Sequence, residues 1–126
     1  MKKRLLLSLW VPTLAVANDA CDHFKTSYDR TYCTAKLFLE SDNELNAVYK
    51  ELKSQLKPEV VKGLTQTQRD WIRHRDMACE NHGEIDVGCN FKVNRERTEY
   101  LRDRLRECKT GNCQTNAITK QSWYTY

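Results

Sequence analysis

Apolar residues recur at helical spacing in two long segments of this chain. In the first, steps of four and three residues lead from Phe38 to Leu56, which places these positions on one face of a helix. In the second, steps of three and four lead from Val61 to Ala78. Pro58 ends the first helix and suits the first turn of the second. Because the link between them is so short, the pattern predicts an antiparallel helical hairpin.

A third pattern, from Val93 to Cys108, predicts another helix after a loop at residues 80–88. The end of the chain, residues 109–126, has no period and is rich in Thr, Asn, Gln and Ser, so we expect an irregular tail. Its aromatic ending, which starts at Trp123, is more typical of a segment that docks onto its own core than of an exposed recognition element. The predicted fold is all-α with no sheet of consequence, and its helices lie near residues 29–56, 59–81 and 89–108.

The start of the chain has the order of an export signal. Three basic residues precede an apolar run from Leu5 to Ala17, which ends in the A-x-A pattern of a cleavage site. That run is shorter than the roughly 20 residues that cross a bilayer. We therefore expect a signal peptide at residues 1–17 and a periplasmic or secreted protein with no membrane span, made of a helical domain at 18–108 and a tail at 109–126.

Charge argues against a nucleic-acid partner. The chain has 21 Lys and Arg against 17 Asp and Glu, and the expected signal carries three of the basic residues, which leaves 18 − 17 = +1. The basic stretch from Lys92 to Lys109 interleaves seven bases with four acids, which is typical of an exposed helix face.

Six cysteines follow the expected signal, and an even number in a small exported domain predicts a disulfide framework. The competing interpretation is a zinc site built from Cys79, His82 and Cys89. No second pair of ligands at metal spacing completes it, so we expect no metal. Six cysteines allow 15 pairings, and the count alone selects none of them.

Polar residues interrupt the two apolar faces: Asp42 on the first, Gln68 and Arg75 on the second. A buried, unpaired charge is costly, so these side chains should bond one another or Asn46 and Tyr49. The alternative is a catalytic carboxylate beside an arginine, but no second carboxylate or histidine shares either face. With no nucleophile motif and no phosphate-binding glycine loop, we expect no catalytic residue and no cofactor, and a protein that is not an enzyme.

These residues carry a family resemblance. The motif D-N-E-L-N-A-V-Y at residues 42–49, with Q-x-x-W-x-x-x-R-D-x-x-C at 68–79 around Trp71, resembles the exported LprI-like lysozyme-inhibitor family. The resemblance runs from Cys21 to Arg106 and implies a helical periplasmic or surface protein, with lysozyme inhibition as the activity attributed to the group. Family members have a cysteine pair like Cys21 and Cys33 ahead of the hairpin. The matched polar residues are those expected in the core, so the motif marks the scaffold and leaves the binding surface unidentified.

For the disulfides, the prediction is three local pairs, with a cross-helix bond between Cys33 and Cys79 as the alternative. Nine residues separate Cys33 from Asp42, and at about 100° per residue this turns Cys33 half a turn away from the apolar face. An outward Cys33 is within reach of the segment that holds Cys21. The expected pairs are Cys21 with Cys33, Cys79 with Cys89, and Cys108 with Cys113.

Two non-enzymatic functions fit this sequence. The first is a lysozyme inhibitor that protects peptidoglycan and uses the acidic loop residues Glu80, Glu84 and Asp86, between two cysteines, to approach a basic lysozyme. The second is an envelope interaction or assembly protein with another protein partner, in which case this loop is a plain solvated turn. Oligomeric state stays open.

Overall fold

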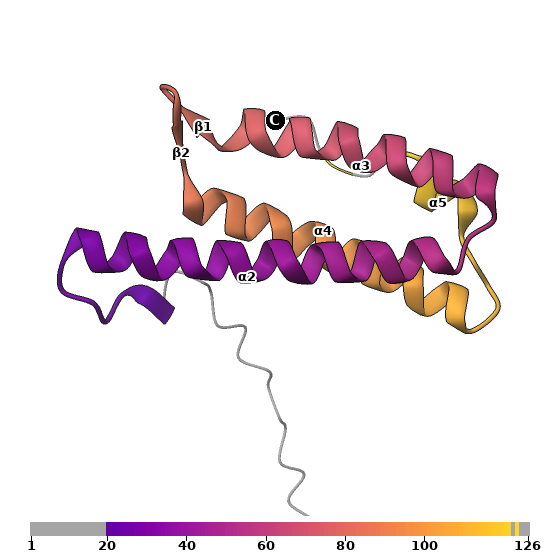
Figure 1. The fold of residues 1–126 in the computed structure, drawn as a ribbon, viewed down its shortest axis with the longest axis horizontal. Helices are drawn as coiled ribbons and strands as arrows, with labels where there is room; N and C mark the ends of the chain where they lie inside the picture. Colours follow the sequence, from indigo (N-terminus) through magenta and orange to yellow (C-terminus); the bar gives the residue numbers. More distant parts are fainter. Residues whose placement is uncertain (1–19, 122, 124–126) are drawn as a thin grey trace, which may run out of the picture.

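The computed structural model describes residues 20–121 and 123, and three long helices form its frame (Figure 1). The all-α, disulfide-stabilised class predicted from the sequence is confirmed. The expected signal at residues 1–17 lies outside the described residues. In chain order the elements are α2 (Ser27–Ser54), α3 (Pro58–Cys79), β1 (Glu80–Asn81), β2 (Glu84–Ile85), α4 (Val87–Lys109) and α5 (Thr115–Thr119).

The long helices begin and end within two residues of the predicted positions because local signals fix them. The Thr26 hydroxyl caps α2 by accepting from the Asp29 backbone N–H at 3.0 Å. Pro58 occupies the first turn of α3, where its missing N–H costs no hydrogen bond. Asp86 caps α4 through a carboxylate oxygen that accepts from the Cys89 backbone N–H at 2.9 Å.

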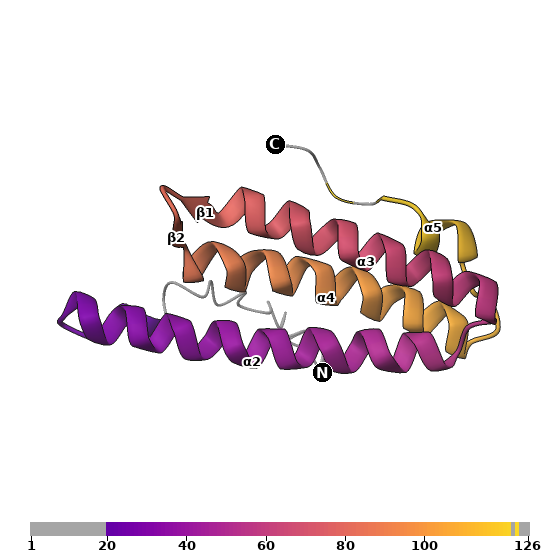
Figure 2. The ribbon, with the colours of Figure 1, turned by 45° about the horizontal axis from the view of Figure 1, so that its top comes forward.

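Helix α3 is antiparallel to both α2 and α4, which run in the same direction (Figures 1 and 2). The sequence predicted that the first and second helices would pack face to face. Instead, α2 packs most closely against α4. Helices α2 and α3 meet through long side chains, as where the Tyr49 hydroxyl donates to the Thr65 hydroxyl at 3.2 Å.

The core lies where the three long helices converge. Its aliphatic residues are almost completely buried, and Trp71 of α3, 2% exposed, packs among them. Burial of this apolar surface is the main force that holds the helices together. The buried aliphatic residues are Leu45, Val48, Leu52, Leu64, Leu101, Leu105 and Ile118.

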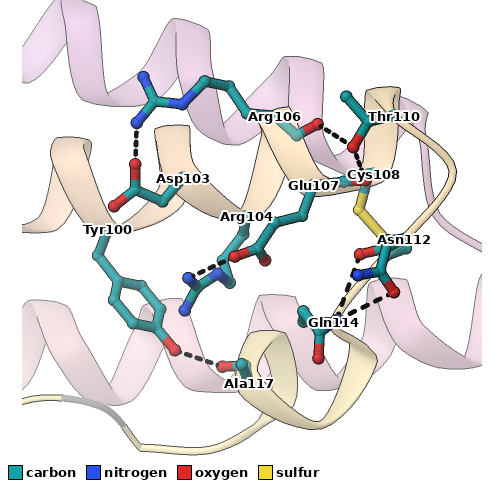
Figure 3. Close-up of polar contacts among 11 residues, drawn as sticks. Tyr100, Asp103, Arg104, Arg106, Glu107, Cys108, Thr110, Asn112, Gln114 and Ala117 are labelled. Atoms are coloured by element: carbon teal, nitrogen blue, oxygen red, sulfur yellow. Dashed lines mark hydrogen bonds and ion pairs between the residues drawn. A yellow bond between two sulfur atoms is a disulfide. The ribbon is translucent and has the colours of Figure 1, made fainter.

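The tail is not irregular throughout, which corrects the prediction for residues 109–126. Helix α5 inserts Ile118 into the core, where it is 1% exposed. The Tyr100 hydroxyl donates to the Ala117 carbonyl oxygen at 2.7 Å (Figure 3). Trp123 also packs against the core, as expected for a docked aromatic end. The missed signal was a single apolar residue in a polar segment.

All six cysteines form disulfides, in the three predicted pairs: Cys21–Cys33, Cys79–Cys89 and Cys108–Cys113. The last two lie at opposite ends of the helical bundle (Figures 1 and 3). In the part of the chain that the structure describes, no helix combines the length and the apolar character needed to cross a membrane.

Candidate functional site

A short β-hairpin projects from one end of the helical bundle, where α3 passes into α4 (Figure 1). Glu80 pairs with Ile85 and Asn81 with Glu84, which leaves a two-residue turn. Both turn residues have positive φ, 52° at His82 and 81° at Gly83, as in the type I′ turns that match the twist of antiparallel strands. The loop predicted between the second and third helices is therefore an ordered hairpin.

Covalent and hydrogen bonds brace this hairpin at its base. The Cys79–Cys89 disulfide joins the end of α3 to the first turn of α4, with a Cα–Cα distance of 5.4 Å. The Asp86 backbone N–H donates to the Cys79 carbonyl oxygen at 3.0 Å, and the Asn90 side-chain amide donates to the Asp86 carbonyl oxygen at 2.9 Å. The tip is thus held in one orientation relative to both helices.

The three acidic residues singled out in the sequence are all exposed on this hairpin. Glu80 lies in β1 and Glu84 in β2, next to Ile85, whose side chain is 72% exposed. Asp86 differs from the other two because one of its carboxylate oxygens caps α4. Its replacement would alter the fold as well as the charge, so Glu80 and Glu84 are the two carboxylates free of a capping role.

A cleft of about 440 Å³ lies at the base of the hairpin. Phe38 of α2 and Ile85 of β2 supply apolar parts of its wall, and Arg75 of α3 contributes the one basic group. Three carboxylates line it as well, so acidic groups outnumber basic ones. These are Asp76, Glu80 and Glu84.

Arg75 joins this cleft to the interior. Its guanidinium donates to the Asp42 carboxylate at 3.3 Å, to the Asn94 side-chain oxygen at 3.1 Å and to the Asp76 carboxylate at 3.0 Å. It also lies over the Trp71 ring at 5.4 Å from the centroid. Only 14% of the Arg75 side chain is exposed. The expected pairing of Arg75 with Asp42 is present, and together with the bond to Asn94 it links α2, α3 and α4.

Two details of the predicted polar network are wrong. The Asp42 side chain is 40% exposed rather than mostly buried, because the buried face of α2 is centred one residue earlier, on Ser41. Asn46 is exposed, and the network instead includes Asn94 of α4, whose amide donates to the Ser41 hydroxyl at 3.1 Å. Sequence reasoning missed Ser41 and Asn94 because short polar side chains at core positions look like surface residues.

A second arginine, Arg97 of α4, lies deeper, with 4% of its surface exposed. Its Nε donates to the Gln68 side-chain oxygen at 3.0 Å. Its guanidinium lies 5.8, 5.5 and 5.4 Å from the ring centroids of Trp71, Tyr100 and Trp123. Burial lowers the pKa of Arg97 to about 10, and the nearby Tyr100 opposes this shift. In the sequence, Arg97 belonged to the third helical pattern and, with Cys89 and Leu101, to the family resemblance, but neither indicated that it would be buried.

This arrangement is suited to binding. All six cysteines are oxidised, so no thiol nucleophile is available. Among residues 20–121 and 123, no three His, Cys, Asp or Glu side chains gather as metal ligands would. The hairpin end carries an acidic projection beside a cleft, and such a charge attracts basic surfaces.

Comparison with known proteins places the chain in a recognised group. A family model described as "Lysozyme inhibitor LprI" matches residues 18–107, which include α2, α3, the hairpin and nearly all of α4. Searches of curated proteins and of solved structures gave no match.

Proposed function

The chain belongs to the LprI lysozyme-inhibitor family, and we propose that it is an exported protein that binds and inhibits a lysozyme through its acidic hairpin. Export is supported by the three disulfides, which persist in oxidising compartments. It is also supported by the order of basic, apolar and small residues in the first 17 positions. The family match supports a lysozyme as the class of partner, and the hairpin geometry supports the acidic hairpin as the contact surface.

The observation that carries this proposal is the braced acidic hairpin. A loop that is already ordered loses little conformational entropy when it binds, so more of the contact energy appears as affinity. The Cys79–Cys89 disulfide and the Asp86 cap provide this order before any partner arrives. A solvated turn of the nine residues between Cys79 and Cys89 without these restraints would lose that conformational entropy on binding.

Charge and shape fit a lysozyme as the partner. Animal lysozymes are basic, and their sugar cleft holds the paired carboxylates that cleave the glycosidic bond. Glu80 and Glu84 attract a basic surface, and the exposed Ile85 adds an apolar contact at the base of the hairpin. The narrow hairpin then covers the entrance of the sugar cleft and keeps peptidoglycan out.

The test is inhibition of cell-wall lysis by the parent protein and by a Glu80→Lys, Glu84→Lys double variant. We expect the parent to abolish lysis near stoichiometric amounts with at least one class of lysozyme. The double variant should bind at least about tenfold more weakly at low ionic strength, and the difference should shrink at high salt because screening weakens charge attraction. Asp86 is left intact, since loss of its cap would cost about 0.5–2 kcal/mol of stability.

The matched control reverses an exposed glutamate elsewhere. Glu96→Lys makes half the charge change of the double variant, about two and a half turns along α4 from the hairpin, and should leave inhibition unchanged. Equal inhibition by the parent and the double variant would remove the hairpin from the interface. A parent that inhibits no class of lysozyme would instead favour the second candidate, an envelope interaction protein with another partner.

A further inference from the structure

Helix α2 carries an apolar stripe that faces away from the core. Tyr28, Tyr32, Ala35 and Leu39 follow one another at steps of four, three and four residues, which keeps them within about 40–60° of one another around the helix. Tyr28 is 80% exposed, Tyr32 61% and Leu39 60%. We call these four residues the α2 stripe. They have the spacing of a coiled-coil seam, and no helix among residues 20–121 covers it.

The stripe is confined to the N-terminal half of α2. In Figures 1 and 2 this end of α2 extends beyond the hairpin end of α3 and α4. Further along the same face the residues become polar, with Asn46 and Lys50 at the positions that continue the stripe. An exposed helix face that only contacts solvent is usually polar along its whole length. The change from apolar to polar residues after Leu39 therefore indicates an apolar surface that ends there.

We propose that the α2 stripe binds the same stripe of a second copy of this chain, with the two helices antiparallel. The seam spacing then forms layers in which Tyr28 meets Leu39 of the second copy and Tyr32 meets Ala35 of the second copy. Each layer combines a large side chain with a smaller one, as close packing of two helices requires. The proposal concerns a surface other than the acidic hairpin and does not depend on lysozyme binding.

Charged residues beside the α2 stripe favour a second copy of this chain as the partner and an antiparallel orientation of the two helices. Asp29 and Lys36 are both exposed, and they lie one heptad apart on the same flank of the stripe. In an antiparallel pair, equivalent flanks meet, so Asp29 of each copy lies opposite Lys36 of the other. In a parallel pair, Lys36 would lie opposite Thr31 of the second copy, and both charges would lack a partner. The surface is therefore complementary to itself in one orientation only.

The interface is short, so the dimer should be weak. Contacts limited to about three helical turns on each copy fall at the low end of specific interfaces, and a Kd on the order of 10–100 µM is expected. Sedimentation velocity of the disulfide-bonded protein, from about 5 µM to 1 mM, measures this equilibrium. Tyr32→Glu should raise the Kd at least a hundredfold while the circular dichroism stays helical, since Tyr32 is exposed.

A control and a mixing experiment identify the surface. Ile85→Glu places the same charge on another exposed apolar residue and should leave the Kd unchanged. Asp29→Lys and Lys36→Asp should each weaken the dimer about tenfold, because like charges then face each other at both contacts between residues 29 and 36. Mixed in equal amounts, these two variants restore opposite charges at both contacts, so they should form a heterodimer with near-parent affinity.

Three outcomes would overturn the proposal. The parent could remain monomeric at 1 mM, the dimer could survive Tyr32→Glu, or the two charge variants could fail to associate when mixed. If the parent is monomeric and Tyr32→Glu weakens lysozyme binding, the stripe belongs to a different partner and self-association is excluded. If the hairpin variants lose inhibition but still form the dimer, the proposed dimer stands, because it uses another surface. The proposed inhibition of lysozyme is tested by the inhibition assay alone.

Discussion

Arg75 and Arg97 both lie against Trp71, and Arg97 is the more deeply buried of the two. Arg75 is paired with the carboxylates of Asp42 and Asp76, so its charge is compensated where it is partly buried. The Nε of Arg97 donates to the Gln68 amide oxygen, and its guanidinium lies near the rings of Trp71, Tyr100 and Trp123. Burial lowers the pKa of Arg97 to about 10.

The first prediction uses this lowered pKa. A lysine at position 97 lacks the Nε–H that donates to Gln68, and burial lowers the pKa of its ammonium group below the value of about 10.4 that it has in the unfolded chain. Between these two pKa values the unfolded chain binds more protons, so stability rises with pH. We expect Arg97→Lys to lose about 2–4 kcal/mol at pH 7 and about 1 kcal/mol less at pH 9.5.

Urea unfolding followed by circular dichroism at the two pH values measures this change. Arg97 of the parent stays largely protonated at pH 9.5, because its pKa is about 10. Arg95→Lys, on the exposed side of α4, is the control and should show no pH-dependent deficit. A loss of stability in Arg97→Lys that is constant across this pH range would contradict a lowered pKa of the buried ammonium group.

Only some residues of the buried polar network could be predicted from the sequence, namely those with charged or amide side chains on an otherwise apolar helix face. Asp42, Gln68 and Arg75 stood out because charged or amide groups interrupted an apolar period. Ser41 and Asn94 did not, since both residue types are common on exposed helix faces, and only the packing of α2 on α4 buries them. The burial of Arg97 depends in part on Trp123, 26 positions along the chain, and no local pattern contains that contact.

At the scale of elements, the sequence predicted those helices whose signals extend over several turns. The three long helices have caps, a proline and periods several turns long, and their bounds were predicted to within two residues. Helix α5 has five residues, too few for a period, and no side-chain cap was found. It forms because tertiary contacts hold it: the Thr67 hydroxyl donates to the Thr119 carbonyl oxygen at 3.1 Å, and Gly63 lies directly beneath Thr119.

The second prediction tests this docking with a double-mutant cycle. Alanine favours a helix interior over glycine by about 1 kcal/mol. At Gly63, however, an added Cβ would lie 2.5 Å from Cγ2 of Thr119, which is a clash. Gly63→Ala should therefore destabilise the parent by about 1 kcal/mol, yet stabilise a Thr119→Ser background, which lacks that methyl group, by a few tenths. Urea unfolding of the four proteins gives the coupling energy. Additive effects would mean that α5 does not rest on α3.

At the scale of the whole molecule, the two ends of the bundle carry different structures. One end bears the acidic hairpin and its cleft, closed by Cys79–Cys89. The other bears the turn into α5, closed by Cys108–Cys113, where Arg104 pairs with Glu107 at 2.8 Å (Figure 3). Because both disulfides close short loops, each adds a similar increment of stability, of about 2–3 kcal/mol on the chain-entropy estimate. Stability and binding can therefore be separated by removing one disulfide or the other.

The last prediction makes that separation. Cys79→Ala with Cys89→Ala should lower stability by about 2–3 kcal/mol and, because the hairpin must then be ordered on binding, weaken lysozyme inhibition at least about tenfold. Cys108→Ala with Cys113→Ala should lower stability by about 2 kcal/mol and leave inhibition unchanged, since it loosens the end remote from the hairpin. Both variants should keep helical circular dichroism, because the core leucines and Trp71 are untouched. If inhibition falls equally in the two variants, the loss is due to lower stability alone. If inhibition falls only in the Cys79→Ala, Cys89→Ala variant, the restrained hairpin, rather than the helical bundle that carries it, determines affinity.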